Sequence, residues 1–229
     1  MVGLGSTTPG GIAVTDASIW NGGYVDASLA SRWLDLTTGH GSTLAEIGPE
    51  MGAAYTIVPA LAAAGYDRLR VVKYAYAGRS LAVDYLPPAG AYLSNLCSAV
   101  HAAIVALPPC RQVTVAGLVW WQGEADANNA GWAAAYQANL TALLAYLRGR
   151  WPLFGSAGMA ASLALITHEP AVRTHCATVN TAISNVAAAD GSAATYDCGA
   201  LLTPGNVHAS GAQQWTAGQG LGTALAGLL

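Results

Sequence analysis

A short apolar run at residues 117–121 (Gly-Leu-Val-Trp-Trp) leads directly into polar side chains that could do chemistry. Gln122 and Glu124 follow it, and Asp126 comes two residues later. The run is uncharged and bulky, which is typical of a buried strand in a parallel sheet. Polar groups just past the carboxyl end of such a strand lie where open α/β sheets bind ligands. This placement favours a functional site, and the alternative is that Gln122 and Glu124 only cap a helix or brace a loop.

Two other segments place useful groups beside turns. Gly78 lies in residues 77–80 (Ala-Gly-Arg-Ser) after a predicted strand, and His208 precedes the last predicted helix. Because the loops at the carboxyl ends of parallel strands converge, Gly78, Gln122 and His208 are expected to share one cleft. A glycine N–H and a glutamine amide are neutral donors to an oxyanion, and one such donor is worth about 2.7–4 kcal/mol. Histidine is the usual base for a serine nucleophile, so the set predicts acyl transfer.

The same residues also have structural interpretations. Gly78 could serve only a tight turn, and His208 could serve only packing or capping beside the last helix. His168, next to Glu169 and just past a predicted strand, is the reserve candidate for a catalytic histidine. The remaining histidines are interpreted as structural or surface residues: His40, His101 and His175.

The elements that must position these residues alternate along the chain from residue 49 on. Helices are predicted at 49–64, 91–107, 132–148, 172–188 and from about 210, and strands at 70–76, 113–121, 162–167 and 194–201. In the clearest helix, 132–148, apolar residues recur every three or four positions and form one face. This alternation predicts an α/β fold with a parallel sheet and helices on both faces. Residues 1–48 are dense in turn-forming residues and are predicted to be loop.

Composition limits the possible partners. The 229 residues are 53% hydrophobic and 9% charged, with a net charge of −3, and no linker divides them, so one domain over 1–229 is expected. The lack of a basic run argues against nucleic acid. The uncharged stretch 151–167 contains proline and glycine. It is shorter than the roughly 18–20 apolar residues of a membrane helix, so no membrane partner is expected.

The four cysteines form no CxxC pair, so neither a zinc site nor a thioredoxin-type site is expected. Cys97 with Cys110 and Cys176 with Cys198 could form disulfides in an exported protein. Four free buried thiols are an equal alternative. The disulfide alternative favours an extracellular or periplasmic location.

Four segments, in this order, resemble the SGNH-type carbohydrate esterases. They are residues 48–50 (Gly-Pro-Glu), 73–81 (Lys-Tyr-Ala-Tyr-Ala-Gly-Arg-Ser-Leu), 120–127 (Trp-Trp-Gln-Gly-Glu-Ala-Asp-Ala) and 207–210 (Val-His-Ala-Ser). The set is similar to the sialate O-acetylesterase and acetylxylan esterase group, carbohydrate esterase family 6. The block at 120–127 is the specific part of the resemblance.

The resemblance implies a flavodoxin-like three-layer α/β/α fold, the SGNH hydrolase fold, with no metal and no other cofactor. It implies hydrolysis of acetyl esters on sugars through Ser, His and usually Asp, so the implied partner is an acetylated carbohydrate. Gly78 and Gln122 would donate to the oxyanion, with the nucleophile's own N–H as the third donor. His208 would be the general base, and Glu124 would organise the loop.

The family's first block, a strand ending Gly-Gln-Ser-Asn-Met, has no full counterpart. The chain begins Met-Val-Gly-Leu-Gly at residues 1–5, so this alignment puts the nucleophilic serine just ahead of Met1. The first strand, in the middle of a 2-1-3-4-5 sheet, is then expected to be missing or incomplete. A longer natural chain is expected, with no catalysis by residues 1–229 alone. Ser6 is the fallback nucleophile, because residues 5–7 (Gly-Ser-Thr) are similar to the Gly-x-Ser turn of other SGNH enzymes.

The family's Asp-x-x-His pattern is also broken, because Gly205 stands three residues before His208. The acid normally holds the imidazole in the correct tautomer. Thr203, Asn206 or a backbone carbonyl could orient the ring instead, and Asp197 is an acid 11 residues away. The chain is therefore expected to be either a Ser–His dyad enzyme or an inactive protein.

The leading prediction is a carbohydrate O-acetylesterase-like hydrolase. One alternative is a pseudoenzyme that binds glycans without turnover through Trp20, Tyr85, Trp121 and Trp132, although tryptophans at such spacings are more often core residues. The other alternative is a structural module of a phage tail or cell-surface assembly, with which the uncharged, Ala/Gly-rich composition is compatible.

Overall fold

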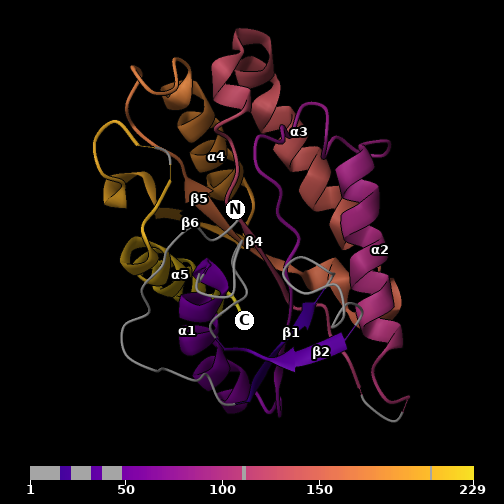
Figure 1. Ribbon diagram of the computed structural model, residues 1–229. Helices are drawn as coiled ribbons and strands as arrows, with labels where there is room; N and C mark the ends of the chain where they lie inside the picture. Colours follow the sequence, from indigo (N-terminus) through magenta and orange to yellow (C-terminus); the bar gives the residue numbers. More distant parts are fainter. Residues whose placement is uncertain (1–15, 22–31, 38–47, 110–111, 207) are drawn as a thin grey trace.

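The computed structural model (Figure 1) describes residues 16–21, 32–37, 48–109, 112–206 and 208–229. Its strands are β1 (Ala17–Asn21), β2 (Arg32–Asp35), β3 (Leu69–Val72), β4 (Gly117–Trp120), β5 (Ala160–Leu165) and β6 (Ala193–Asp197). Its α-helices are α1 (Pro49–Ala63), α2 (Ala91–Val105), α3 (Ala130–Arg148), α4 (Cys176–Ala189) and α5 (Gly211–Ala226). Short 3₁₀ helices lie at Asp126–Asn128, Pro152–Phe154, Ser156–Gly158 and Gly199–Leu201.

The strands form two half-sheets, in the orders β2-β1-β3 and β4-β5-β6. β1 runs parallel to β3, with Ile19 opposite Val71, and antiparallel to β2. β5 runs parallel to both of its neighbours, and its Leu163 lies opposite Trp120 and Thr195. This arrangement confirms the predicted α/β fold with parallel strand pairing.

Helices cover both faces of the half-sheets and give three layers (Figure 1). α1 and α5 pack against each other on one face, while α2, α3 and α4 lie on the other. A Cβ atom on Gly218 of α5 would collide with the Pro49 carbonyl, so glycine lets these two helices approach closely. The apolar face predicted for 132–148 is confirmed at five buried residues: Tyr136, Leu140, Leu143, Leu144 and Leu147. Trp132, which the same face was predicted to include, is exposed.

The prediction of loop over residues 1–48 is wrong at β1 and β2. Ala17, Ser18, Ile19 and Trp20 are all buried, so β1 lacks the alternation that marks a half-exposed strand. Its backbone is paired on both sides, by β2 and by β3. This long-range pairing overrides the local excess of turn-forming residues.

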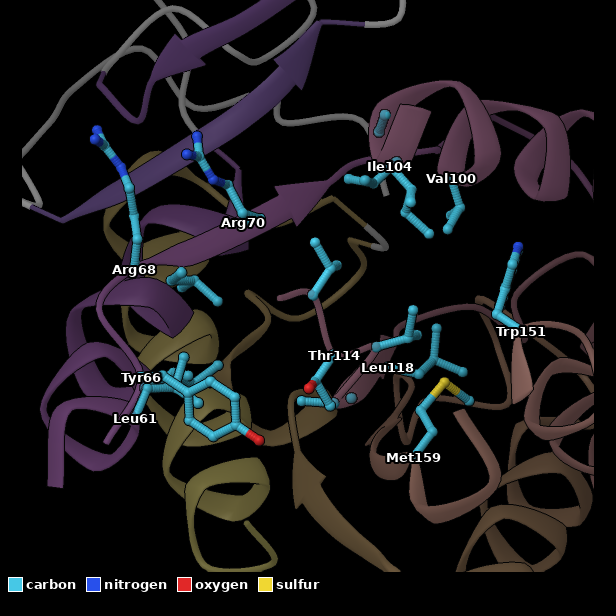
Figure 2. Close-up of a pocket in the computed structure, with 18 of the residues that line it drawn as sticks. Leu61, Tyr66, Arg68, Arg70, Val100, Ile104, Thr114, Leu118, Trp151 and Met159 are labelled. Carbon is cyan, nitrogen blue, oxygen red and sulfur yellow. The ribbon is translucent and has the colours of Figure 1, made fainter. Parts of the chain in front are cut away.

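A mostly apolar cavity of about 260 Å³ lies between β3 and β4, and we call it the β3–β4 slot. Within the described part of the chain, β3 is hydrogen-bonded only to β1, and β4 only to β5. Leu61 of α1, Val100 and Ile104 of α2, and Leu118 of β4 surround the slot (Figure 2). The slot therefore lies where the family resemblance places the first strand of the sheet.

Three of the four cysteines lie in described positions, and all three are free and buried: Cys97, Cys176 and Cys198. The free-thiol alternative therefore holds for them, and the Cys176–Cys198 disulfide is not formed. Cys110 lies outside the described residues. None of the helices in the described ranges is long and apolar enough to cross a membrane.

Candidate active site at the ends of β3 and β4

A cavity of about 540 Å³ opens beyond the carboxyl ends of β3 and β4, and we call it the site cavity. Gly78 reaches it from the loop after β3, and Gln122 and Glu124 reach it from the loop after β4. His208 reaches it from the loop before α5. The structure therefore brings together four residues that the sequence singled out. Their chemical roles remain predictions.

The site cavity has no Ser, Thr or Cys among its described lining residues, so it shows no side-chain nucleophile there. Ser80, two residues after Gly78, is buried, and its N–H and hydroxyl both donate to the Asp84 carboxylate, at 2.8 and 3.2 Å. Ser80 therefore shapes a turn. The fallback nucleophile Ser6 lies outside the described residues.

Asp126 links the loops that follow β3 and β4. It is fully buried, and its carboxylate accepts the N–H groups of Leu81 and Ala82 at 2.8 and 2.9 Å. The same carboxylate accepts the side-chain amide of Gln122 at 2.7 Å. Burial raises the pKa of the Asp126 carboxyl, and these hydrogen bonds act in the opposite direction. Asp126 thus fixes the segment that follows Gly78 against the segment that carries Gln122.

Hydrogen bonds fix both the side-chain amide and the backbone carbonyl of Gln122. Its Nε2 donates to the Arg79 carbonyl at 3.0 Å and to Asp126 at 2.7 Å, which engages both amide hydrogens. The Tyr136 hydroxyl lies 2.6 Å from the Gln122 carbonyl, to which it donates, and 3.2 Å from Gln122 Oε1. Gln122 can donate to a bound group only if one of its two present acceptors gives way.

Glu124, unlike Gln122 and Asp126, has a side-chain oxygen without a hydrogen bond to any described residue. Its Oε1 is buried and has no hydrogen-bond partner in the described part of the chain. Burial raises the pKa of the Glu124 carboxyl, while backbone N–H groups and the nearby Arg173 guanidinium act to lower it. Arg173 also lines the site cavity, and its Nε is likewise buried without a partner among the described residues.

His208 sits on a short turn. Its N–H donates to Asn206 Oδ1 at 2.8 Å, and the Asn206 N–H donates to the Thr203 carbonyl at 3.0 Å. Gly205 has a φ of +77°, a left-handed conformation that favours glycine. α5 begins just beyond, with a capping box between Ser210 and Gln213. The imidazole makes no hydrogen bond to any described residue.

The side chains that the sequence offered as orienters of His208 are engaged elsewhere. Asp197 Oδ1 lies 2.8 Å from Nε2 of His168, and it also accepts the Ala200 N–H at 3.0 Å. Asn206 Oδ1 accepts the backbone N–H of His208, and Thr203 Oγ1 accepts the Gln213 side chain at 3.3 Å. None of them is hydrogen-bonded to the imidazole.

The Gly48-Pro49-Glu50 motif lies apart from the site cavity. Glu50, in the first turn of α1, accepts from Lys73 Nζ at 2.9 Å, and both side chains are largely buried. A Cβ on Gly48 would collide with the Glu50 carboxylate. The motif therefore docks the start of α1 against the segment after β3.

The aromatic residues predicted to stack on sugars divide into two groups. Tyr85, Trp121 and Trp132 line the site cavity, and Trp132 is 37% exposed. Trp20 lies in β1 instead, buried in edge-to-face contact with Trp33, with ring centroids 5.5 Å apart. The prediction that Trp20 contributes to a sugar-binding surface is therefore wrong, because the side chain is committed to the core beside β2.

Three further residues matter at this site: Asp126, which the sequence placed among the polar groups after the strand without a specific role, and Tyr136 and Arg173, for which it predicted none. The sequence could have predicted a role for Asp126, because it is the third polar residue after the same buried strand. Tyr136 belongs to the apolar face of α3, and only the structure shows its hydroxyl at Gln122. No group of three or more His, Cys, Asp and Glu residues suited to a metal ion occurs within the described ranges.

Comparisons with known proteins find a family and a fold. Residues 27–226 match the model of the family described as carbohydrate esterase, sialic acid-specific acetylesterase. Among solved structures, an X-ray structure of a protein from Arabidopsis thaliana is similar, with a TM-score of 0.70 and 17% sequence identity. The similarity covers 95% of this chain and 83% of that chain, and at this identity it shows the fold alone. No curated protein matches the chain.

Proposed function

The chain belongs to the carbohydrate esterase family of sialic acid-specific acetylesterases, as its four sequence segments implied, and we propose that it hydrolyses O-acetyl esters of a carbohydrate. One observation carries the proposal. Gly78, Gln122 and His208, which are far apart in sequence, line one cavity beyond the ends of β3 and β4. An acetylated sialic acid is the first substrate to test, and acetylated xylan is the second.

In the proposed reaction, His208 takes the proton of a serine hydroxyl as its oxygen attacks the acetyl carbonyl. The proton then passes to the sugar oxygen that leaves, and water repeats the sequence to release acetate. The Gly78 N–H supports an oxyanion role, because it donates to no group in the described part of the chain. Gln122 joins it by exchanging its bond to the Arg79 carbonyl for a bond to the oxyanion.

We place the serine nucleophile in a strand that precedes Met1 and occupies the β3–β4 slot. Two observations support this placement. The slot is mostly apolar, and it lies between β3 and β4, whose neighbouring strands among the described residues are β1 and β5. A strand parallel to β3 and β4 would end at the site cavity, close to the unsatisfied Oε1 of Glu124. On this proposal, residues 1–229 alone have no esterase activity.

A second candidate function, glycan binding without turnover, is favoured by the aromatic lining. Trp132 and Tyr76 are both partly exposed on the site cavity, where a sugar ring could stack. The proposed esterase uses the same surface to hold its substrate, so the two functions differ only in turnover.

Acetate release separates the two functions. Three proteins would be assayed on p-nitrophenyl acetate and on O-acetylated sialic acid: residues 1–229, a longer chain extended upstream of Met1 to the next plausible start, and that longer chain carrying His208→Ala. We expect only the longer chain with intact His208 to release acetate. The Ser6→Ala variant of the longer chain should keep full activity. A folded longer chain that binds sialic acid but releases no acetate would refute the esterase and favour glycan binding.

A further inference from the structure

The proposed base lacks an acid on its own loop. Gly205 stands where the Asp-x-x-His pattern has its carboxylate, and its φ of +77° would strain an aspartate there. A histidine base needs a group that fixes its tautomer and stabilises the imidazolium that forms. If the proposed function holds, that group has to reach His208 from another part of the chain.

Glu169 brings a carboxylate to this position from the end of β5. Its Oε2 accepts the Gly205 N–H at 2.7 Å, across 36 positions of sequence. The Glu169 carboxylate therefore lies beside Gly205, the position at which the Asp-x-x-His pattern has its aspartate. Its second oxygen, Oε1, accepts no hydrogen bond from any described residue, so it is available to a ring N–H.

Hydrogen bonds fix the backbone on both sides of Glu169. Its N–H donates to Thr167 Oγ1 at 3.3 Å, and its carbonyl accepts the N–H groups of Val172 and Arg173, both at 3.0 Å. The hydrogen bond from Gly205 then fixes the distance between this turn and the loop that carries His208. A carboxylate anchored in this way is preorganised, which is what an orienting group requires.

The other acids near the strand ends are not placed to orient His208. Asp197 is paired with His168, and Asp126 is saturated by donors from the loops after β3 and β4. Glu124 lines the cavity from the loop after β4, on a different segment from Gly205. Glu169 is the acid that is hydrogen-bonded to the His208 loop among the described residues.

We propose that Glu169 is the positioning residue of His208: its carboxylate anchors the loop at Gly205 and accepts the imidazole N–H that faces away from the serine. This proposal rests on the proposed function. The chain is then a Ser–His–Glu enzyme whose acid comes from the end of β5.

Glu169→Gln tests the charge while it keeps the anchor, because a glutamine Oε1 can still accept the Gly205 N–H. In the longer active chain we expect kcat for acetate release to fall about 10²- to 10⁴-fold, with KM changed less than about twofold. Asp197→Asn is the matched control, since it removes the charge of the neighbouring His–Asp pair. It should keep kcat within about twofold of the parent.

A double-mutant cycle separates positioning from mere structural support. If Glu169 acts through His208, Glu169→Gln should cause no further loss in the His208→Ala background. For Glu169→Ala, formate should restore part of the lost kcat, and it should restore none in His208→Ala. Circular dichroism would check that each variant is folded.

Three results would overturn the assignment: Glu169→Gln with parental kcat, a loss that is equally large in the His208→Ala background, or Asp197→Asn with the larger loss. A parent chain that is folded but inactive on every acetyl ester would refute the proposed function, and the role of Glu169 with it. The parent's activity therefore tells the two failures apart.

Discussion

Asp126 and Glu124 stand two residues apart in one loop, yet one oxygen of the Glu124 carboxylate lacks, within the described ranges, the hydrogen-bond donors that Asp126 has. Asp126 accepts three hydrogen bonds, from the N–H groups of Leu81 and Ala82 and from Gln122. Glu124 Oε1 is buried and accepts none from the described residues. Burial raises the pKa of both carboxyl groups.

The difference separates a carboxylate whose hydrogen bonds are complete from one that still has an oxygen unpaired among the described residues. A buried carboxylate with a full set of donors is a structural group, because removing it leaves those donors unpaired. A buried carboxylate oxygen without a donor costs stability, so a group that donates to it would stabilise the protein. We therefore interpret Asp126 as part of the framework, and Glu124 as the acceptor for a group that the proposed upstream strand brings.

The largest expected effect is on Asp126. Asp126→Ala leaves the Leu81 and Ala82 N–H groups without an acceptor and frees Gln122, so we expect a loss of about 3–5 kcal/mol in the free energy of unfolding. Asp126→Asn keeps the size and one acceptor oxygen, so its loss should be smaller. Urea denaturation of residues 1–229 measures both. A loss below about 1 kcal/mol for Asp126→Ala would remove the distinction between the two carboxylates.

An intermediate effect is expected for Tyr136→Phe. The Tyr136 hydroxyl donates to the Gln122 carbonyl at 2.6 Å and accepts Trp120 Nε1 at 3.1 Å, so its removal leaves a buried and a half-buried group unpaired. We expect about 1–3 kcal/mol less stability in thermal or urea unfolding. In the active chain, kcat should also fall, because Gln122 loses one of its supports. Unchanged stability would show that the Gln122 side of the loop is less rigid than the contacts indicate.

The smallest effect, and the one of opposite sign, is expected for Glu124→Gln. Because the folded-state pKa is raised, the folded protein binds this proton more tightly than the unfolded chain does, and stability falls as pH rises above the ordinary value of about 4.3. Glu124→Gln removes that loss. Residues 1–229 should gain about 1 kcal/mol at pH 7 and nothing near pH 4.

The same substitution in the longer chain sharpens the comparison. If the upstream strand donates to Glu124, the gain at pH 7 should disappear there and turn into a loss. An equal gain in both chains would show that the strand does not supply the partner of Glu124.

Much of the framework could be predicted from the sequence because its signals are local. The helix over 132–148 follows from one apolar face, and the convergence of Gly78, Gln122 and His208 follows from parallel strand order. β1 was missed because its pairing with β3 joins segments about fifty residues apart, and a strand buried on both faces carries no alternation. The contacts of Asp126 with Leu81 and of Glu169 with Gly205 span 45 and 36 positions, and no local pattern encodes them.

The central claim is that this site removes acetyl groups from a carbohydrate with His208 as the base. The most direct measurement is acetate release from O-acetylated sialic acid by the chain extended ahead of Met1, with and without His208→Ala. We expect turnover by the extended chain and a loss of about 10³-fold or more in His208→Ala. A folded extended chain with no turnover, or one whose turnover survives His208→Ala, would contradict the account.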